Sequence, residues 1–441
     1  MTAATADRTG DRADDRASDP AGDRADAGPL AGTAARLLRG LSATVPRLAL
    51  ADHLAVHGPV PAALAGGHLD LLDWTEAVDL RGRGGAAFPF TRKARGVRAA
   101  RQEQAAEALV VGNGSEGEPA SHKDARLMQS APHLVLDGAE LAAVAVGARE
   151  ARLVVGAPAA ARSLADAMAE RGRGHVRLRV VPVPDRFVTG ESSAVVRAAE
   201  GRRAIPAFTL RRTAEGGVNG RPTLVSNVET LAQLALLARL GVAGYRGLGT
   251  PDEAGTMLLT VHRGLGAEVV EAAYGTALTT VLDGARVGAG VLLGGYHGRF
   301  LPASRAATTV LSRRADDAGA TLGAGVVVVL PPGCCPLAEA APVVRFLADE
   351  SAGQCGPCVH GLRAIADRVT ELAEGTCPPE GLAQLERWRA MVAGRGACGH
   401  PDGVVRFVSS LLEAFPTEVT MHQHASCGRP FRRLFPLGDA R

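Results

Sequence analysis

The sequence predicts an α/β domain, a small α+β module and a C-terminal helical bundle. Short apolar runs alternate with helical stretches up to about residue 250, which indicates a parallel sheet covered by helices on both faces. Short strand-like runs around one brief helix then indicate the module, and helical patterns follow it. The expected boundaries are 1–32 for a disordered tail, 33–250 for the α/β domain with an N-terminal helical adapter, 251–305 for the module, 306–335 for a connecting strand, 336–420 for the bundle and 421–441 for a C-terminal tail.

The composition argues against several classes of protein. With 49 basic and 46 acidic residues, the chain lacks the net charge that would attract nucleic acid or an anionic membrane. Aromatic residues make up 3% of the chain, too few for a surface that stacks on single-stranded nucleic acid. No apolar stretch is long enough to cross a membrane, and residues 1–28 lack the apolar core of a signal peptide. We therefore expect a cytoplasmic protein without direct membrane insertion.

The expected elements follow from periodicity and turn residues. Residues 1–28 are mostly Asp, Arg, Ala and Gly, and they bury too little apolar surface to offset the entropy of ordering. Residues 33–72 have a helical pattern, and further helices are expected within 187–194, where Glu191 could simply be a cap, and after 221–230. Strands are expected at 108–113, 152–156, 176–181, 258–261, 268–271, 291–295 and 326–330, and other helices at 133–147, 158–171, 277–283, 342–350, 362–373, 381–392 and 404–415.

A glycine-rich stretch at residues 81–90, followed by Lys93, is the first candidate binding site. Two arginines lie among three glycines there, so bare backbone N–H groups and cationic side chains are available to a phosphate. The strand expected at 108–113 ends in a polar turn, and ligands of open α/β sheets bind where strands end. No convincing strand precedes the stretch and no Gly-Lys-Ser/Thr follows it. Taken alone, it fits a nucleotide or flavin phosphate cradle and a plain flexible turn equally well.

The seven cysteines all lie after residue 333 and form the second candidate site. Cys355 and Cys358 have two residues between them, and Cys398 follows 40 positions after Cys358. Two thiolates from one tight turn and a third from a distant segment suit zinc or an iron–sulfur cluster. Two incidental thiols are the alternative. A thioredoxin-like redox pair is less favoured because no βαβ unit surrounds the motif.

In combination, these motifs resemble a known family. Residues 81–88, 113–124, 190–191 and 227–230 occur in order before the three cysteines. The combination is similar to the NADH-oxidising flavoprotein subunit of respiratory complex I and to diaphorase subunits of bacterial hydrogenases and formate dehydrogenases, over roughly residues 45–415. The resemblance implies an FMN-binding α/β domain, a β-grasp-like (SLBB-type) module and a helical bundle that carries a [4Fe–4S] cluster.

The resemblance also implies an activity and partners. Hydride would pass from NADH to FMN, and single electrons would then pass to the cluster and on to a ferredoxin-like or other redox protein subunit, or to a quinone-linked acceptor. Such a partner could hold the protein at the inner face of a membrane. The alternative is a degenerate paralogue that keeps the fold as a non-catalytic scaffold or interaction subunit.

The resemblance gives each matching residue an expected role. Glu118 and Glu191 would be catalytic, and Phe88 would stack on the adenine of NADH. The other matches would hold FMN: Gly82, Arg83, Gly84, Gly85 and Lys93 at the phosphate and ring edge, Asn113 and Glu116 beside the flavin and nicotinamide, Gly190 beside the ring, and Asn227 and Thr230 at the ribityl chain.

The expected cluster ligands are Cys355, Cys358 and Cys398, but Ala352 stands where the family has a fourth cysteine. Another group therefore completes the site, or the site holds [3Fe–4S], or it is empty. In the C-terminal tail, Cys427 and two nearby histidines could form a separate metal site, although an exposed tail is the favoured interpretation. Candidates for the fourth cluster ligand are Cys334, Cys335, Cys377, Cys427, His360 and Ser351.

Six positions of the expected nucleotide pocket also depart from the family pattern. They are Ser115 for an aspartate, Ser192 for a glutamate, Ala87 for a glycine, Thr209 for a lysine, Arg212 for a phenylalanine and Gly96 for an aromatic residue. Loss of a stacking ring or of a carboxylate acceptor weakens binding by roughly 1 kcal/mol or more in each case. We therefore expect weaker NADH affinity than in the respiratory subunit, or a different electron donor.

Overall fold

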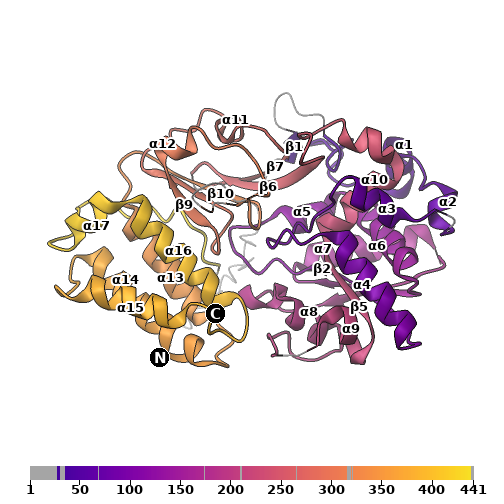
Figure 1. Ribbon diagram of the computed structural model, residues 1–441. Helices are drawn as coiled ribbons and strands as arrows, with labels where there is room; N and C mark the ends of the chain where they lie inside the picture. Colours follow the sequence, from indigo (N-terminus) through magenta and orange to yellow (C-terminus); the bar gives the residue numbers. More distant parts are fainter. Residues whose placement is uncertain are drawn as a thin grey trace, which may run out of the picture.

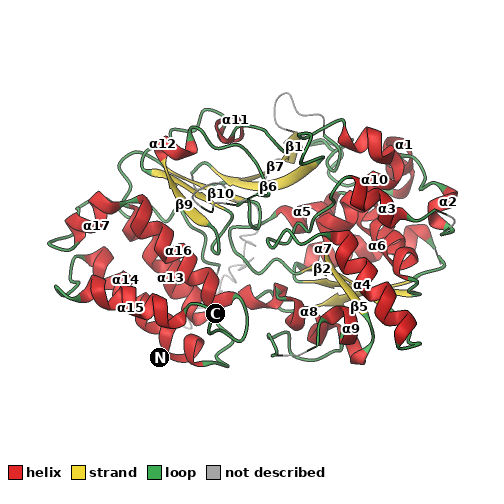
Figure 2. Cartoon of the chain, viewed as in Figure 1, coloured by secondary structure: helices red, strands yellow, loops and turns green. Residues whose placement is uncertain are grey.

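The computed structural model describes most of the chain and divides it into three parts (Figure 1). An α/β domain and a helical bundle lie on either side, and a second sheet lies above and between them (Figure 2). Most of the expected N-terminal tail and Thr209 lie outside the described residues. The described residues are 27–29, 35–67, 69–172, 174–208, 211–264, 266–314, 319 and 321–438.

The α/β domain contains a four-stranded, fully parallel sheet with strand order β4-β3-β2-β5. Val110 in the central strand pairs with Ala151 on one side and Leu224 on the other. Because all four strands are parallel, their carboxyl ends meet at one edge of the sheet. The strands are β2 (Leu109–Gly114), β3 (Glu150–Val155), β4 (Arg177–Pro182) and β5 (Thr223–Asn227).

Helices cover both faces of this sheet, because successive residues of β2 pack into different cores. Val110 packs into the core formed mainly with α4, α6 and α10, whereas Leu109 and Val111 pack against α8 on the other face. Gly138 allows α6 to approach α10 closely, because a Cβ there would lie 1.8 Å from the carbonyl oxygen of Leu231. The helices of the domain are α1 (Leu50–His57), α2 (Ala62–Ala65), α3 (Leu71–Ala77), α4 (Phe90–Glu103), α5 (Lys123–Ser130), α6 (Pro132–Val146), α7 (Pro158–Arg171), η1 (Phe187–Gly190), α8 (Ser192–Ala199), α9 (Thr213–Gly216), η2 (Val218–Gly220) and α10 (Val228–Arg246).

The second sheet is mixed and has six strands in the order β1-β7-β6-β10-β8-β9. The strand expected to be a connection, β10, lies at its centre, parallel to β6 and antiparallel to β8. Residues 27–29, which the sequence places in a disordered tail, form β1 and pair in parallel with β7. The elements of this part are β1 (Ala27–Pro29), β6 (Thr256–His262), β7 (Ala267–Ala273), α11 (Leu278–Leu282), β8 (Gly290–Leu293), β9 (Arg299–Pro302), α12 (Ala303–Ala306) and β10 (Val326–Leu330).

The helical bundle has one apolar core, to which α13, α14, α15 and α16 contribute. After α17 the chain turns back, and Leu434 and Phe435 are buried in the same core. No helix in the described part of the chain has both the length and the hydropathy needed to span a membrane. The helices are α13 (Pro336–Asp349), η3 (Pro357–Gly361), α14 (Leu362–Glu374), α15 (Gly381–Val392), α16 (His400–Ala414) and α17 (Pro416–His422).

Candidate functional site

A cavity of about 110 Å³ lies at the edge of the parallel sheet where β2 and β5 end. Four separate segments form its walls: the glycine stretch with the start of α4, the end of β2, the residues around the start of α8, and the junction of β5 with α10. The residues expected from the sequence that line it are Gly82, Gly84, Phe88, Lys93, Asn113, Gly190, Asn227 and Thr230.

A second cavity, of about 120 Å³, lies on the other side of the glycine stretch. Arg83 and Gly85 line this cavity, together with Tyr274 and Arg313. The two cavities share Gly82 and the two alanines that follow Gly85 as a common wall. The glycine stretch is therefore a thin partition between two hollows.

Arg83 anchors the glycine stretch to the rest of the protein. Its backbone N–H donates a hydrogen bond to the Thr230 hydroxyl at 2.9 Å, and its guanidinium donates to the carbonyl oxygen of Thr256 at 3.2 Å. The guanidinium also lies 5.1 Å from the centre of the Tyr274 ring, and its Nε lies 3.7 Å from a carboxylate oxygen of Glu229. These contacts fix the loop against α10 and β6. The role of the Arg83 side chain is therefore to hold the loop in place.

Lys93 is the cationic side chain of the first cavity. Its ammonium donates a hydrogen bond to the carbonyl oxygen of Val225 at 3.0 Å, and burial lowers its pKa. An ammonium has three donors, and no other hydrogen bond of Lys93 occurs among the described residues. It can therefore offer donors and positive charge to an anionic group in the cavity.

An amide network holds the strand ends together around this cavity. Asn113 donates to the carbonyl oxygen of Gly190 at 2.9 Å, which ties the end of β2 to the segment before α8. Asn227 donates to the Asp124 carboxylate at 2.6 Å and accepts from the backbone N–H of Glu229, so it also caps α10. The two asparagines therefore fix the geometry of the cavity walls.

The carboxylate of Glu116 is turned away from the cavity and caps α5. It accepts hydrogen bonds from the Ser121 hydroxyl and from the backbone N–H groups of Asp124 and Ala125, at 2.5, 3.1 and 2.9 Å. Burial, reinforced by the Asp124 carboxylate, raises the pKa of Glu116 to about 7. In the described part of the chain, Glu116 lines neither of the two cavities.

Glu118 joins the α/β domain to the second sheet. It accepts a hydrogen bond from the backbone N–H of Tyr296 at 2.9 Å, and burial raises its pKa to about 8. Residue 295 must be glycine for this approach, because a Cβ there would lie 2.4 Å from the carboxylate. Glu118 also does not line either cavity.

Glu191 is the N-cap of α8, which agrees with the simpler of the two interpretations of this residue. Its carboxylate accepts hydrogen bonds from the backbone N–H groups of Ser193 and Ala194 at 2.8 and 3.2 Å. The same carboxylate lies close enough to Cys398 to raise the pKa of that thiol, together with the larger effect of burial. The charge of Glu191 is therefore felt at the cysteines of the bundle.

The three cysteines expected to bind a cluster lie in one region of the bundle. Burial and the neighbouring Cys355 thiol raise the pKa of Cys358 to about 12, and the Cys398 thiol also faces this pair. Burial opposes ionisation of Cys355, but backbone N–H groups of Ala397 and Cys358 outweigh it and lower its pKa. The three thiols, from the turn at η3 and the approach to α16, are therefore near enough to influence one another's ionisation, but their sulfur atoms do not all lie within 4.8 Å of one another.

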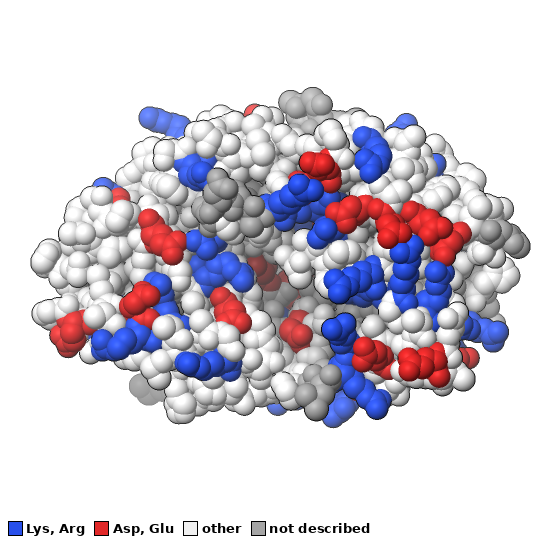
Figure 3. All heavy atoms as spheres, in the orientation of Figure 1, with Lys and Arg blue, Asp and Glu red and all other residues white. Residues whose placement is uncertain are grey.

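The segment 187–191 separates the first cavity from this cysteine group. Its Phe187 ring packs on His400, two residues after Cys398, with ring centres 5.4 Å apart. The backbone N–H of Phe187 donates to Glu350 at 3.0 Å, just before the cysteine turn. Figure 3 shows a hollow between the bundle and the α/β domain, with acidic side chains inside it and basic side chains around it.

Two family models match this chain. Residues 75–236 match the Nuo51 FMN-binding domain, and residues 338–422 match the iron–sulfur binding region of NADH-ubiquinone oxidoreductase F. The chain is 27% identical to the F 2 subunit of NADH-quinone oxidoreductase from Rhizobium meliloti (strain 1021), over 80% of this chain and 88% of that protein.

This chain therefore resembles the NADH-oxidising flavoprotein subunits in both its FMN-binding and its iron–sulfur region.

Hydrogenase proteins are also similar to this chain. The chain is 28% identical to the NAD-reducing hydrogenase HoxS subunit alpha of Cupriavidus necator (strain H16), over 76% of this chain and 58% of that protein. It superposes on a crystal structure of NAD⁺-reducing [NiFe]-hydrogenase in the H₂-reduced state with a TM-score of 0.74 and 28% identity, covering 86% of this chain and 67% of that chain.

The six candidates for the fourth cluster ligand, needed because Ala352 replaces a cysteine, lie at two different ends of the helical bundle. Cys335 lies at the start of α13, and the three-cysteine group lies beyond its end, so the 14-residue helix separates them by about 20 Å. Cys427 lies beside Cys335. Cys334 and Cys377 lie at the same end of the bundle, next to Cys335 and after the end of α14. Of the six candidates, only Ser351 and His360 therefore lie close in the chain to the three cysteines.

Sequence reasoning gave no role to a buried charged group beneath the site. Lys123 lies 2.7 Å from the Asp124 carboxylate and 2.9 Å from the Glu229 carboxylate, and all three side chains are buried. Glu229 also accepts the backbone N–H of Leu258 in β6 at 3.0 Å. The sequence could have indicated this group, because its charged residues lie within the motifs at 113–124 and 227–230.

Proposed function

We propose that this chain is a flavin-dependent oxidoreductase subunit that passes electrons from NADH through FMN to an iron–sulfur cluster and on to a protein or quinone-linked acceptor. The observation that carries this proposal is the convergence of four segments on one cavity, with the segment 187–191 shared between that cavity and the three-cysteine group. The two family-model matches and the names of the relatives support the same function.

The residues of the cavity fit FMN. The glycine backbone allows close approach of a phosphate, Lys93 supplies positive charge, and the amides of Asn113 and Asn227 supply donors and acceptors. When bound, the flavin supplies the conversion of a two-electron donor into one-electron steps. The cavity of about 110 Å³ is smaller than the roughly 300 Å³ of typical ligand pockets, so we expect FMN binding to enlarge it.

Roles for individual residues follow from these contacts. Arg83 and Thr230 would hold the loop that contacts the phosphate, and Gly190 would be held beside the ring by Asn113. Phe88, which is 43% exposed, is free to stack on the adenine of NADH. Glu118 and Glu191 are engaged with backbone N–H groups, so we assign them positioning roles instead of the catalytic roles expected from the sequence.

The three thiols fit an iron–sulfur cluster, with Cys355, Cys358 and Cys398 as ligands. Ser351 or His360 would complete a [4Fe–4S] cluster, and without either the site would hold [3Fe–4S]. In this proposal the three domains keep the expected boundaries, except that β10 joins the second sheet, and that sheet is the β-grasp-like (SLBB-type) module.

The same proposal includes a redox protein partner, such as a ferredoxin-like subunit, because the relatives are named as subunits of larger oxidoreductases. All seven cysteines are free, which suits a reducing cytoplasm. A peripheral place at the inner face of a membrane would then come through the partner. We retain the expectation of weak NADH affinity, because Ser192 lines the cavity where the family has a glutamate.

NADH-dependent reduction of ferricyanide tests this function directly. The full chain, purified anaerobically and supplied with FMN, should reduce ferricyanide when NADH is added, at a high KM for NADH. A non-catalytic scaffold, which Ala352 favours, should bind no FMN and show no such activity. Activity that saturates at low micromolar NADH would contradict the expected weak affinity but not the proposed function.

A further inference from the structure

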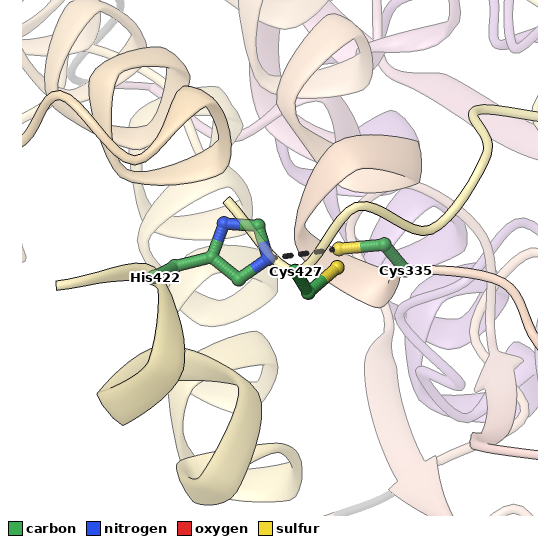
Figure 4. A group of neighbouring side chains, drawn as sticks. All are labelled: Cys335, His422 and Cys427. Atoms are coloured by element: carbon green, nitrogen blue, oxygen red, sulfur yellow. Dashed lines mark hydrogen bonds between the residues drawn. The ribbon is translucent and has the colours of Figure 1, made fainter. Parts of the chain in front are cut away.

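A second group of metal-binding side chains lies at the far end of α13 from the three-cysteine group. The ligand atoms of Cys335, His422 and Cys427 all lie within 4.8 Å of one another (Figure 4). They come from the residue before α13, the last residue of α17 and the segment that follows. The sequence favoured an exposed tail here, whereas His422 is only 1% exposed.

The histidine is oriented for metal binding. Its Nδ1 lies 3.0 Å from the carbonyl oxygen of Leu372, and its Nε2 lies 3.3 Å from the sulfur of Cys335. A carbonyl oxygen only accepts hydrogen bonds, so Nδ1 carries the proton and Nε2 presents its lone pair toward the sulfur atoms. A backbone carbonyl that fixes the second nitrogen in this way is the usual support of a metal-binding histidine.

The first thiol is placed where a thiolate is favoured. Cys335 is the N-cap of α13, and its sulfur accepts a hydrogen bond from the backbone N–H of Ala338 at 3.4 Å. A helix N-terminus stabilises negative charge.

We propose that Cys335, His422 and Cys427 bind one zinc ion. Two thiolates and one imidazole are ligands that suit zinc. Zinc–sulfur and zinc–nitrogen bonds of about 2.3 and 2.0 Å place tetrahedral ligand atoms about 3.5–3.8 Å apart. The observed ligand atoms lie within 4.8 Å of one another, and the His422 nitrogen lies 3.3 Å from the Cys335 sulfur. Cys427 is half-buried, so a water molecule can occupy the fourth position.

The zinc ion fastens the C-terminal segment onto the bundle. Beyond Cys427, the buried ring of Phe435 packs against Tyr296 and Phe300 of the second sheet, with ring centres 6.2 and 6.1 Å apart. Leu434 donates its backbone N–H to the buried carboxylate of Glu339 in α13 at 2.9 Å. The C-terminal segment thus contacts both the bundle and the second sheet. The zinc site would hold the start of this segment, at Cys427, against the bundle.

Metal analysis of the full chain tests this site separately from the cluster. Protein produced with added zinc and purified anaerobically with a thiol reductant should contain about one tightly bound zinc per chain in addition to iron. The Cys427→Ser and His422→Ala variants should lose roughly tenfold or more of this zinc affinity and keep their iron. The Cys398→Ser variant should lose iron and keep its zinc.

Matched controls lie beside each ligand. His424→Ala removes an exposed histidine two residues from His422, and Cys377→Ser removes a buried cysteine of the same bundle end, so both should keep zinc. Equal zinc content in Cys427→Ser, His424→Ala and wild type would overturn the proposal. A Cys335–Cys427 disulfide found by mass spectrometry in the reduced preparation would overturn it as well.

A measurement on wild-type protein avoids variants that fail to fold. Zinc should slow alkylation of Cys427 by iodoacetamide roughly tenfold, because a coordinated thiolate is withdrawn from reaction. Removal of the metal with a chelator should restore the rate. An alkylation rate of Cys427 that is the same with and without zinc would exclude the site.

Discussion

The ammonium of Lys93 lies 3.0 Å from the carbonyl oxygen of Val225, so the first turn of α4 is hydrogen-bonded to β5 across the cavity. This single contact places a partly buried cation beside the bare backbone of the glycine stretch. From this arrangement we infer that the FMN phosphate lies beside Lys93 and the glycine stretch.

Replacement of Lys93 should weaken FMN binding. A hydrogen bond to a charged group contributes about 1.5–3 kcal/mol, so Lys93→Gln should lower FMN affinity roughly tenfold to a hundredfold. Titration of the flavin-free protein, followed by quenching of flavin fluorescence, measures the change. Arg92→Gln removes an exposed cation next in the chain and should leave FMN affinity unchanged. Equal affinities of the two variants would contradict the phosphate position.

Replacement of Glu191 should lower stability before it affects chemistry. Its carboxylate caps α8, and loss of an N-cap costs about 0.5–2 kcal/mol. Glu191→Ala should therefore lower the free energy of unfolding in urea by this amount, whereas Glu191→Asp should recover most of it. If Glu191→Ala retained full stability but lost NADH-dependent activity, the residue would be catalytic, as the sequence first indicated.

The carboxyl group of Glu118 should make stability depend on pH. Burial raises its pKa from 4.5 to about 8. The folded state therefore holds this proton more tightly than the unfolded state, so the contribution of Glu118 to stability is full below about pH 4.5 and is lost as the pH rises to about 8. The neutral variant Glu118→Gln lacks this loss, and it can still accept the hydrogen bond from Tyr296.

Melting temperatures at pH 5 and pH 8 measure this effect. The difference between Glu118→Gln and wild type should become more positive at the higher pH. The exposed Glu103 serves as a control, because Glu103→Gln should show the same small difference at both values. A pH-independent difference for Glu118→Gln would show that the carboxyl group is already ionised at pH 5.

Iron content should separate the cluster ligands from the other cysteines. Cys398→Ser should lose most of its iron, whereas Cys377→Ser, at the far end of the bundle, should keep it. If His360 or Ser351 completes the cluster, one of His360→Ala and Ser351→Ala should convert a [4Fe–4S] signal into a [3Fe–4S] signal in electron paramagnetic resonance spectra. Loss of iron in Cys377→Ser would contradict the placement of the cluster.

The sequence predicted the fold well where apolar runs were continuous. The strands expected at 108–113, 152–156, 176–181 and 326–330 correspond to β2, β3, β4 and β10. The strand β5 was missed because its short run carries polar residues and leads directly into a helix. The start of α13 was placed too late because Pro342 looked like a helix start, whereas Pro336 has that role and Pro342 lies inside the helix.

The candidate site was only partly predictable. The family motifs identified the segments that meet at the cavity, but the directions of the Glu116 and Glu191 carboxylates depend on which helix N-terminus lies nearby. The contact between Cys335 and His422 joins residues 87 positions apart. No local spacing encodes such a pair, because it exists only once α13 and α17 have packed together.

The most direct test of the central claim is the absorbance of anaerobically purified protein, combined with quantitation of its flavin and iron. We expect about one FMN and three to four iron atoms per chain, and visible bands that bleach when NADH is added. A colourless protein that takes up no FMN on reconstitution would contradict this expectation.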